Sequence, residues 1–302
     1  MPVRLITMLI KKRISIVYFL RTVKWDLLAI VAYALIAGSF DHYGILSQVS
    51  IPLAVTSFAG TVLSLLLAFR TSQSYERWWE ARVVWGAIVN DSRTLVRQVK
   101  LFMPQTAEGL AVAKEFAHRQ GVWCFALGES LRKLGHSDKV ISYFTKSGTD
   151  SGNKPNMILN HHSDVLAAAT DQFKLDANKQ VQIDATLARL CDSMGKCERI
   201  KNTVFPRAYS VLIHFLIYVL MTILPFGLED QSKLVEISLT IIIPSLFISI
   251  EQTAILMQDP FENRPTDTPM TQLAKTIENT LMEIVGEPPV NQVEPPTSYY
   301  IM

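Results

Sequence analysis

The sequence carries little charge and few cysteines for its length. Only 19% of its 302 residues are charged while 49% are hydrophobic, which is apolar-rich for a wholly soluble chain. The formal net charge is +2, so the basic excess of a nucleic-acid-binding protein is missing and we expect no nucleic-acid partner. The three cysteines, Cys124, Cys191 and Cys197, lack the short spacing of metal ligands. We expect them to be buried, reduced thiols in a cytosolic region.

Catalytic and cofactor-binding patterns are also scarce. His161 and His162 are adjacent, so on a helix they point in different directions and cannot chelate one ion together. We expect both to be exposed. The segment KSGTDSGNKPNM has two glycines, but no Gly-Lys-Ser/Thr follows it, which favours a surface loop over a phosphate site. No nucleophile elbow occurs. We therefore predict a protein that is not an enzyme, with no metal site and no cofactor.

Four apolar runs, at residues 25–40, 51–69, 208–228 and 237–257, predict membrane-spanning helices, because a bilayer core takes about 20 helical residues. The linkers between runs one and two and between three and four are short, so the runs form two hairpins. The second run continues, without a turn signal, into a segment rich in arginine and tryptophan that keeps helical periodicity. One helix is therefore expected to leave the membrane and continue into water.

Lysine and arginine predict the orientation of the hairpins. Basic residues precede the first run and follow the second, whereas the first linker has none and the second only Lys233. We therefore predict a multi-pass protein of the cell inner (plasma) membrane with both termini cytoplasmic. Residues 1–24 are expected to form a helix on the inner membrane surface. Residues 70–207 are expected to form a large cytosolic helical region, in which the first helix ends at Pro104. In the cytosolic tail, 258–302, residues 271–286 predict a short amphipathic helix. The proline-rich end predicts an extended segment, which we expect to lie along a neighbouring subunit.

Some polar residues of the spans need partners. Glu251 cannot face lipid cheaply, so it has a partner or meets water, and His214 is expected to bond to a neighbouring helix. Glu76 and Glu80 are helical neighbours with Arg77 between them. We favour pairing between subunits for these carboxylates over a role in tuning the potential of a pore.

Several blocks resemble the bestrophin family of membrane ion channels, in its bacterial branch. They are SYERWWEARVVWG, NDSRTL, GKCERIKNTVFPRAY and, after the fourth run, MQDPF. The Arg-Trp-Trp and Cys-Glu-Arg-Ile blocks are specific, whereas four spans alone would not be. The resemblance implies an all-α membrane protein with four transmembrane helices and a large cytosolic helical region. It also implies a funnel-like homopentamer around one axial pore.

By the same resemblance, the second span lines a narrow neck with side chains one turn apart, here Phe69, Leu65 and Thr61. Periodicity independently places Phe58, Val62, Leu65 and Phe69 within roughly a 60° arc of a helix. Packing of this stripe on neighbouring helices remains open, because core and lipid-facing stripes look alike. Thr61 and Leu65 are less aromatic than the neck of animal members, which puts anion preference through aromatic edges in doubt. A second, cytosolic constriction is expected among Asn178, Gln180 and Val181.

These observations predict a passive channel for small inorganic monovalent ions, embedded in a lipid bilayer. The family default is chloride, and sodium or potassium is an open alternative for the bacterial branch. Calcium gating is not expected, because Arg264 and prolines interrupt the carboxylates Asp259, Glu262 and Asp267, and calcium loops need closely arranged oxygen ligands. The alternative function is a membrane scaffold or regulatory protein that binds a cytosolic partner.

Overall fold

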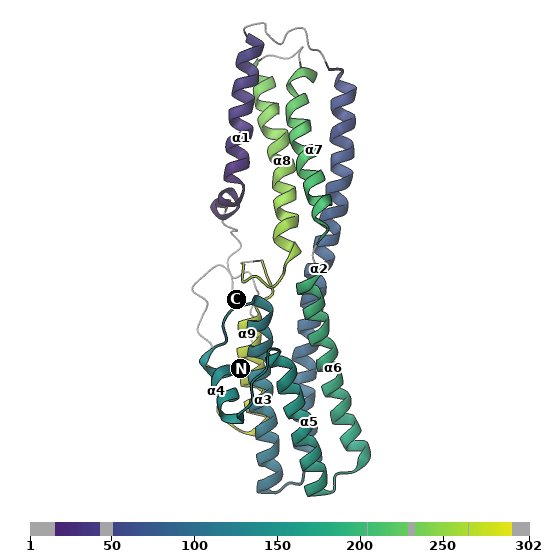
Figure 1. Cartoon of the computed structure of the whole chain (residues 1–302), viewed down its shortest axis with the longest axis vertical. Helices are drawn as coiled ribbons and strands as arrows, with labels where there is room; N and C mark the ends of the chain where they lie inside the picture. Colours follow the sequence, from purple (N-terminus) through teal and green to yellow (C-terminus); the bar gives the residue numbers. More distant parts are fainter. Residues whose placement is uncertain (1–15, 43–50, 204, 229–232, 265, 292–302) are drawn as a thin grey trace, which may run out of the picture. The chain divides into compact units, whose positions relative to one another are not determined.

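The structure, a computed structural model, describes residues 16–42, 51–203, 205–228, 233–264 and 266–291 (Figure 1). These residues form helices and connecting loops, with no strand among them, as the sequence predicts. The helices are α1 (Ile16–His42), α2 (Leu53–Phe102), α3 (Ala107–Arg132), α4 (Asp138–Ser147), α5 (Lys154–Phe173), α6 (Ala177–Asn202), α7 (Arg207–Ile223), the short 3₁₀ turn η1 (Pro225–Gly227), α8 (Lys233–Gln258) and α9 (Met270–Val285).

The chain divides into two compact units, and α2 contributes to both. Residues 13–78 and 204–258 form the first unit, here called the apolar bundle. Residues 79–203 and the segment that begins at Asp259 belong to the second unit, here called the helical body.

The apolar bundle consists of α1, the first half of α2, α7 and α8. Among the described residues, three helices are long and apolar enough to cross a membrane, and a fourth span is reached if α6 and α7 count as one broken span. The bundle also exposes large apolar side chains, such as Trp25, Leu35 and Leu246, an arrangement typical of helices that face lipid. The prediction of membrane spans is therefore confirmed in its coarse form.

The third predicted span, 208–228, is shorter than the sequence suggested. Helix α7 has 17 residues and ends at Ile223. Pro225 then begins the 3₁₀ turn, because proline lacks the N–H that the next helical turn would need. Pro244, by contrast, lies inside α8 without ending it. Proline is more frequent in membrane-spanning helices than in helices of soluble proteins.

The helical body has its own core around α3. Helix α9 packs against α3, as do α4, α5 and α6, and the core contains Trp85, Trp123 and Phe116 at 0% exposure. Side-chain caps begin three of its helices: Thr106 for α3, Asn153 for α5 and Asp176 for α6. The predicted helices that end before Pro104 and that form the start of the tail are confirmed by α2 and α9. Helix α4 was not predicted.

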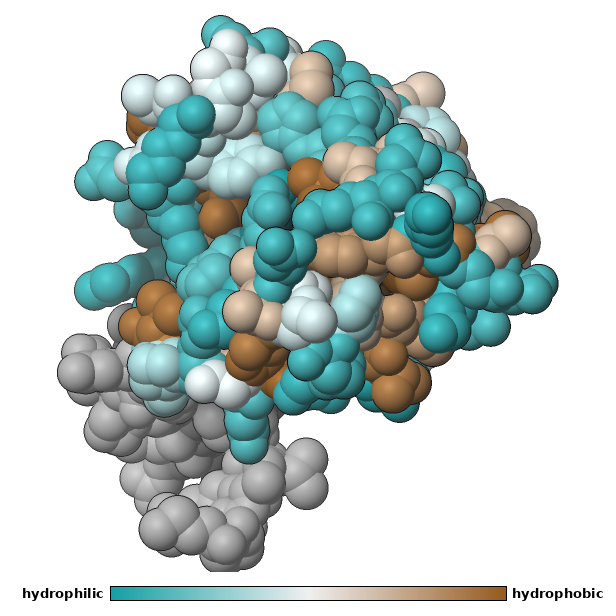
Figure 2. Space-filling view, turned by 90° about the horizontal axis from the view of Figure 1, so that it is seen from below, coloured by the Kyte–Doolittle hydropathy of each residue, from teal (hydrophilic) through white to brown (hydrophobic). Residues whose placement is uncertain are grey.

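The end of the molecule that lies at the bottom of Figure 1 is seen directly in Figure 2. Its surface is mostly hydrophilic, with hydrophobic patches between the hydrophilic residues. Scattered exposed apolar residues of this kind are normal for a surface in water. This end of the helical body therefore agrees with an aqueous location.

Expectations about three single residues were wrong. His161 is half-buried and its Nδ1 lies 2.8 Å from the hydroxyl of Tyr143. His162 is 0% exposed and its ring lies 4.8 Å from that of Phe116, centroid to centroid; it lies in the middle of α5 on the face that packs against α3. Burial also lowers the pKa of His162 well below its ordinary value. Cys191 is exposed, whereas Cys124 and Cys197 are buried, because Cys191 lies on the outward face of α6.

Candidate functional site

Helix α2 has one buried face in the apolar bundle. Thr56, Leu63, Leu67, Arg70 and Ser74 are each 3% exposed or less. Their spacings of three, four and seven residues place them on one side of a helix. The opposite side of the same helix is therefore directed away from the other helices of this chain.

The predicted neck residues all lie on that outward side. Phe58 is 71%, Leu65 73%, Phe69 57% and Val62 37% exposed, and Thr61 is also exposed. Within one chain, Phe58 and Leu65 do not pack into a core. Such an apolar face meets lipid, another protein surface or the wall of a pore.

Phe69 differs from the other four because it has partial support from α7. Its ring lies 6.2 Å from that of Tyr209 in an edge-to-face arrangement, which aromatic pairs prefer. The hydroxyl of Tyr209 donates to the carbonyl oxygen of Leu66 at 3.1 Å. Phe69 is thus held at one side and open at the other.

The hydroxyl of Thr61 is occupied by its own helix. It donates to the carbonyl oxygen of Ser57 at 2.8 Å, and Ser64 bonds to Gly60 in the same way. A hydroxyl proton bonded to the backbone is not presented to an ion beside the helix. Within the stripe from Phe58 to Phe69, the hydroxyl of Thr61 is therefore available only as an acceptor.

A charged network lies within the apolar bundle, where the sequence left Glu251 and His214 without assigned partners. Arg70 Nη1 donates to Glu251 Oε1 at 2.9 Å, and both side chains are 2% exposed. The second carboxylate oxygen of Glu251 lies 2.9 Å from His214 Nδ1. His214 Nε2 lies 3.9 Å from Asp26 Oδ1, which accepts a bond from Tyr218 at 3.2 Å.

This network joins α1, α2, α7 and α8 through one residue or more from each. Sequence reasoning identified the polar residues inside apolar runs but could not pair them. The available signal was that Asp26, Arg70, His214 and Glu251 all lie near span ends that were predicted to share one side of the membrane.

The residues expected at a cytosolic constriction all lie at the start of α6, on different sides of it. Val181 is 65% exposed, Asn178 is exposed and Gln180 is half-buried. Asn178 and Val181 are three residues apart and share a face, whereas Gln180 points about 100° away from Val181. If one face of this turn meets a pore, Asn178 and Val181 belong to it together.

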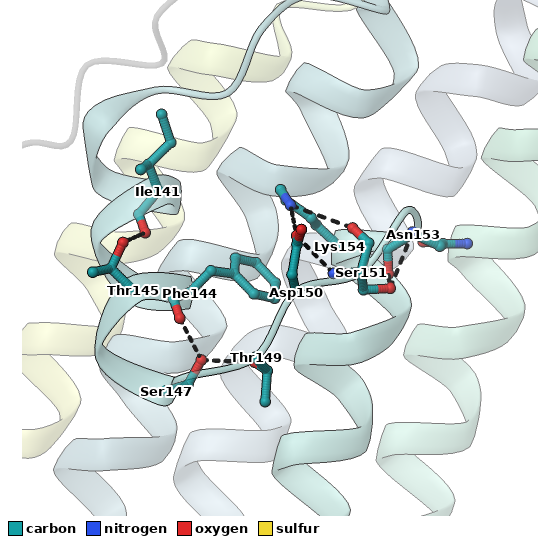
Figure 3. A network of polar contacts seen from close by, with 9 residues as sticks. All are labelled: Ile141, Phe144, Thr145, Ser147, Thr149, Asp150, Ser151, Asn153 and Lys154. Carbon is teal, nitrogen blue, oxygen red and sulfur yellow. Dashed lines mark hydrogen bonds and ion pairs between the residues drawn. The ribbon is translucent and has the colours of Figure 1, made fainter.

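The loop between α4 and α5 is held by hydrogen bonds and an ion pair among its own residues, as Figure 3 shows. Lys154 Nζ bonds to Asp150 at 2.9 Å, and Ser151 and Asn153 bond to each other across the turn. Asn153 Oδ1 also accepts the backbone N–H of Asn156 and so caps α5. Lys154 therefore has a carboxylate partner, which agrees with a surface loop.

The carboxylates that follow α8 are engaged by protein groups. Asp259 bonds to Lys201 at 2.5 Å, Glu262 pairs with Arg264, and Asp267 accepts the backbone N–H of Arg264 at 2.9 Å. Over the described ranges of the chain, no group of three or more His, Cys, Asp or Glu side chains is placed to bind a metal ion.

The carboxylates near the end of the second span have partners within the chain. Glu80 pairs with Arg199 of α6 at 2.5 Å, so this carboxylate is satisfied without a second subunit. Glu76 accepts weak bonds from Ser72 and Gln73, each at 3.4 Å.

Comparison with known proteins gives consistent matches along most of the chain. The family described as Bacterial/Fungal Bestrophin protein matches residues 2–283. The voltage-dependent anion channel-forming protein of Ralstonia nicotianae is 29% identical over 246 residues, 80% of each chain. The protein of the same description, YneE, from Escherichia coli (strain K12) is 28% identical over 252 residues, covering 82% of this chain and 80% of its own.

Solved structures agree with these sequence matches. The crystal structure of a bacterial bestrophin homologue from Klebsiella pneumoniae superposes with a TM-score of 0.79 at 25% sequence identity. It covers 88% of this chain and all of the other. The Ralstonia and Escherichia relatives are both described as channel-forming proteins, which agrees with the expectation that the chain is not an enzyme.

Proposed function

This chain belongs to the Bacterial/Fungal Bestrophin family, and we propose that it forms a homopentameric channel that conducts small inorganic anions across the cell membrane. The anion preference is supported by the description of its relatives as anion channel-forming proteins. The pentamer follows from the resemblance of its sequence blocks to bestrophins. The orientation, with both termini cytoplasmic, follows from the distribution of lysine and arginine.

The observation that supports the proposal most directly is the outward apolar stripe of α2. Phe58, Leu65 and Phe69 are more than half exposed in the single chain. On the same helix face, the residues that follow Phe69 become polar, with Ser72 and Glu76 both exposed. A face that changes from apolar to charged along a continuous helix suits a narrow neck that opens into water.

In this proposal, five copies of α2 surround the axis with rings of Thr61, Leu65 and Phe69, and Val62 and Phe58 flank them. An apolar ring limits conduction because an ion must shed water that the wall cannot replace. Asn178 and Val181 are proposed to contribute a second constriction. Calcium gating is not part of the proposal, because Asp259 and Glu262 are already paired with basic side chains.

The test is ion flux into liposomes that contain the purified protein, with chloride and sodium gradients applied separately. We expect chloride flux to exceed sodium flux in the wild-type protein. Sodium flux alone would support the cation alternative for this branch. No flux from correctly assembled protein would contradict the channel and favour the membrane scaffold.

A matched pair of variants tests the position of the stripe. In a ring of five, Leu65→Lys should keep or raise chloride flux, whereas Leu65→Glu should lower it by roughly tenfold or more through like-charge repulsion. Leu246→Lys and Leu246→Glu are the controls, since Leu246 is 58% exposed on α8. Equal effects of the two charges at Leu65 would contradict its place in the pore.

A further inference from the structure

The charged network of the apolar bundle contains one histidine, His214. Imidazole is the side chain whose ordinary titration falls between about pH 5 and pH 8. His214 faces Glu251 of α8 through Nδ1 and Asp26 of α1 through Nε2, at 2.9 and 3.9 Å. Tyr218 of the same helix stacks edge-on with its ring at 5.0 Å. On the side of α2, Arg70 shares the carboxylate of Glu251.

With both carboxylates ionised, the charges of this network balance only when His214 is protonated. With neutral His214, Arg70 supplies one positive charge against the two negative charges of Asp26 and Glu251. With protonated His214, two positive charges meet two negative ones. Net charge within apolar surroundings costs free energy that a balanced cluster avoids. The protonated state is therefore the one that ties α1, α7 and α8 together most firmly.

The network also contacts the helix that carries the proposed neck. Arg70 directly follows Phe69 and points about 100° around the helix axis from it. Its guanidinium lies 5.5 Å from the ring of Phe205, which lies 5.6 Å from the ring of Tyr209. Tyr209 in turn supports Phe69. A change at Glu251 therefore reaches Phe69 through its neighbour in sequence and through two aromatic rings.

We propose that His214 is a proton-responsive positioning residue, which couples pH to the neck helix α2 through Glu251 and Arg70. Protonated His214 fixes α7 against α1 and α8, and the Arg70–Glu251 pair then holds α2 with Phe69 in its supported position. When His214 loses the proton, Asp26 keeps only its hydrogen bond from the Tyr218 hydroxyl. The contact between His214 of α7 and Glu251 of α8 becomes weaker, because it is no longer an ion pair. Phe69 gains freedom, so the current should rise as pH increases. The use of current as a readout depends on the proposed channel function.

The test compares currents of the whole protein in planar bilayers, at symmetrical chloride, between about pH 5 and pH 8. The wild-type current should rise with pH through a single midpoint. His214→Asn keeps an amide donor near the position of Nδ1 but cannot titrate, so its current should lose this dependence. Asp26→Asn removes the carboxylate that lies 3.9 Å from Nε2 and should also alter the pH profile of the current.

His118→Asn is the control, because His118 is an exposed histidine of the helical body that bonds to Glu287. This variant should keep the wild-type profile. A wild-type current without pH dependence, the same profile in His214→Asn, or loss of the profile in His118→Asn would each overturn the proposal.

Thermal unfolding of the same proteins separates this proposal from the channel function. The unfolding temperature of the wild-type protein should differ between the two ends of this pH range, because the ion pairs of the network exist only in the folded state. His214→Asn should reduce that difference. If no current is seen under any condition, the channel proposal fails, and the unfolding data alone test the role of His214. An equal pH dependence of the unfolding temperature in wild type and His214→Asn would overturn that role.

Discussion

The ion pair of Arg70 and Glu251 has almost no contact with solvent, since both side chains are 2% exposed. Removing one partner of such a pair leaves an uncompensated charge, at a cost of about 3–5 kcal/mol, whereas replacing both with apolar residues is often neutral. We therefore expect the pair to specify how α2 packs against α8 more than it adds to the free energy of unfolding.

We expect Glu251→Leu to lower the stability of the purified protein by about 3–5 kcal/mol, because Arg70 remains charged and buried. The double variant Arg70→Met, Glu251→Leu should recover most of this loss. Thermal unfolding in detergent measures both. Equal destabilisation by the single and the double variant would show that the charge left on Arg70 is not the cause.

Asp267, in the loop before α9, is a second buried charge with a different consequence. It is 1% exposed, one of its carboxylate oxygens has no hydrogen-bond partner, and burial raises its pKa to about 6. A raised pKa in the folded state means that the folded protein binds the proton more tightly. The contribution to stability is then complete below the unfolded pKa of about 3.9 and is lost as pH rises through about 6.

We therefore expect the free energy of unfolding to fall as pH rises from about 4 to just above 6. The Asp267 carboxyl should account for at most about 3 kcal/mol of this fall. Asp267→Asn should flatten that part of the profile, because the amide cannot ionise. Chemical denaturation across this range measures the change. A variant that falls in stability as steeply as the wild type would show that Asp267 is not responsible.

At the scale of elements, α2 has two faces with separate tasks. Its buried face, with Leu63 and Leu67, contributes to the core of the apolar bundle. Its outward face carries Leu65 and Phe69, whose truncation removes few contacts within the chain. Substitutions on the two faces should therefore differ in kind.

Leu65→Ala and Phe69→Ala should widen and hydrate the proposed neck, so that single-channel conductance rises while the pentamer persists. Phe69→Ala should also cost about 0.5–1.5 kcal/mol, since its ring pairs with that of Tyr209. Single-channel recording beside size-exclusion profiles separates conduction from assembly. Unchanged current together with damaged assembly would place both residues in a packing interface.

The first turn of α3, which packs against the preceding loop, requires glycine at one position. A Cβ on Gly109 would lie 2.1 Å from the carbonyl oxygen of Pro104, and backbone cannot move aside as a flexible side chain can. We expect Gly109→Ala to destabilise the protein by about 1–3 kcal/mol. Gly135→Ala is the matched control, because a Cβ there has no atom within 4 Å. Equal unfolding temperatures of the two variants would contradict this reading of the turn.

Periodicity and proline positions predicted most of these elements from sequence, including the end of α2 before Pro104 and the tail helix α9. Other features depend on tertiary packing, which local patterns do not encode. The pair His161–His162 reads as polar, yet α3 buries His162 against Phe116. The partners Arg70 and Glu251 are 181 residues apart, so no spacing rule joins them. The sequence predicted an apolar stripe on α2, but it could not show whether this stripe is buried in a core or exposed. The structure shows that it is exposed in the single chain.

At the scale of the whole molecule, the start of the C-terminal tail is attached to its own helical body. Glu287 bonds to His118 at 2.7 Å and to Lys114 at 3.3 Å. Asn291 donates its backbone N–H to Asn279 at 2.9 Å and its side-chain amide to Glu278 at 2.7 Å. The expected contact of the tail with a neighbouring subunit therefore concerns the residues after Asn291, which lie outside the described part of the chain.

Two truncations separate these roles. Deleting residues 292–302 should leave the unfolding temperature of the protein unchanged. The pentamer should, however, dissociate at a lower detergent concentration than the wild type, as measured by native mass spectrometry. Deleting residues 287–302 should in addition lower the unfolding temperature, because His118 and Lys114 lose Glu287 and the contacts of Asn291 with α9 are removed. The first deletion tests only the contact between subunits, and the second adds the contacts within the chain. A pentamer that survives the shorter deletion as well as the wild type does, with unchanged stability, would show that the end of the tail does not join one subunit to the next.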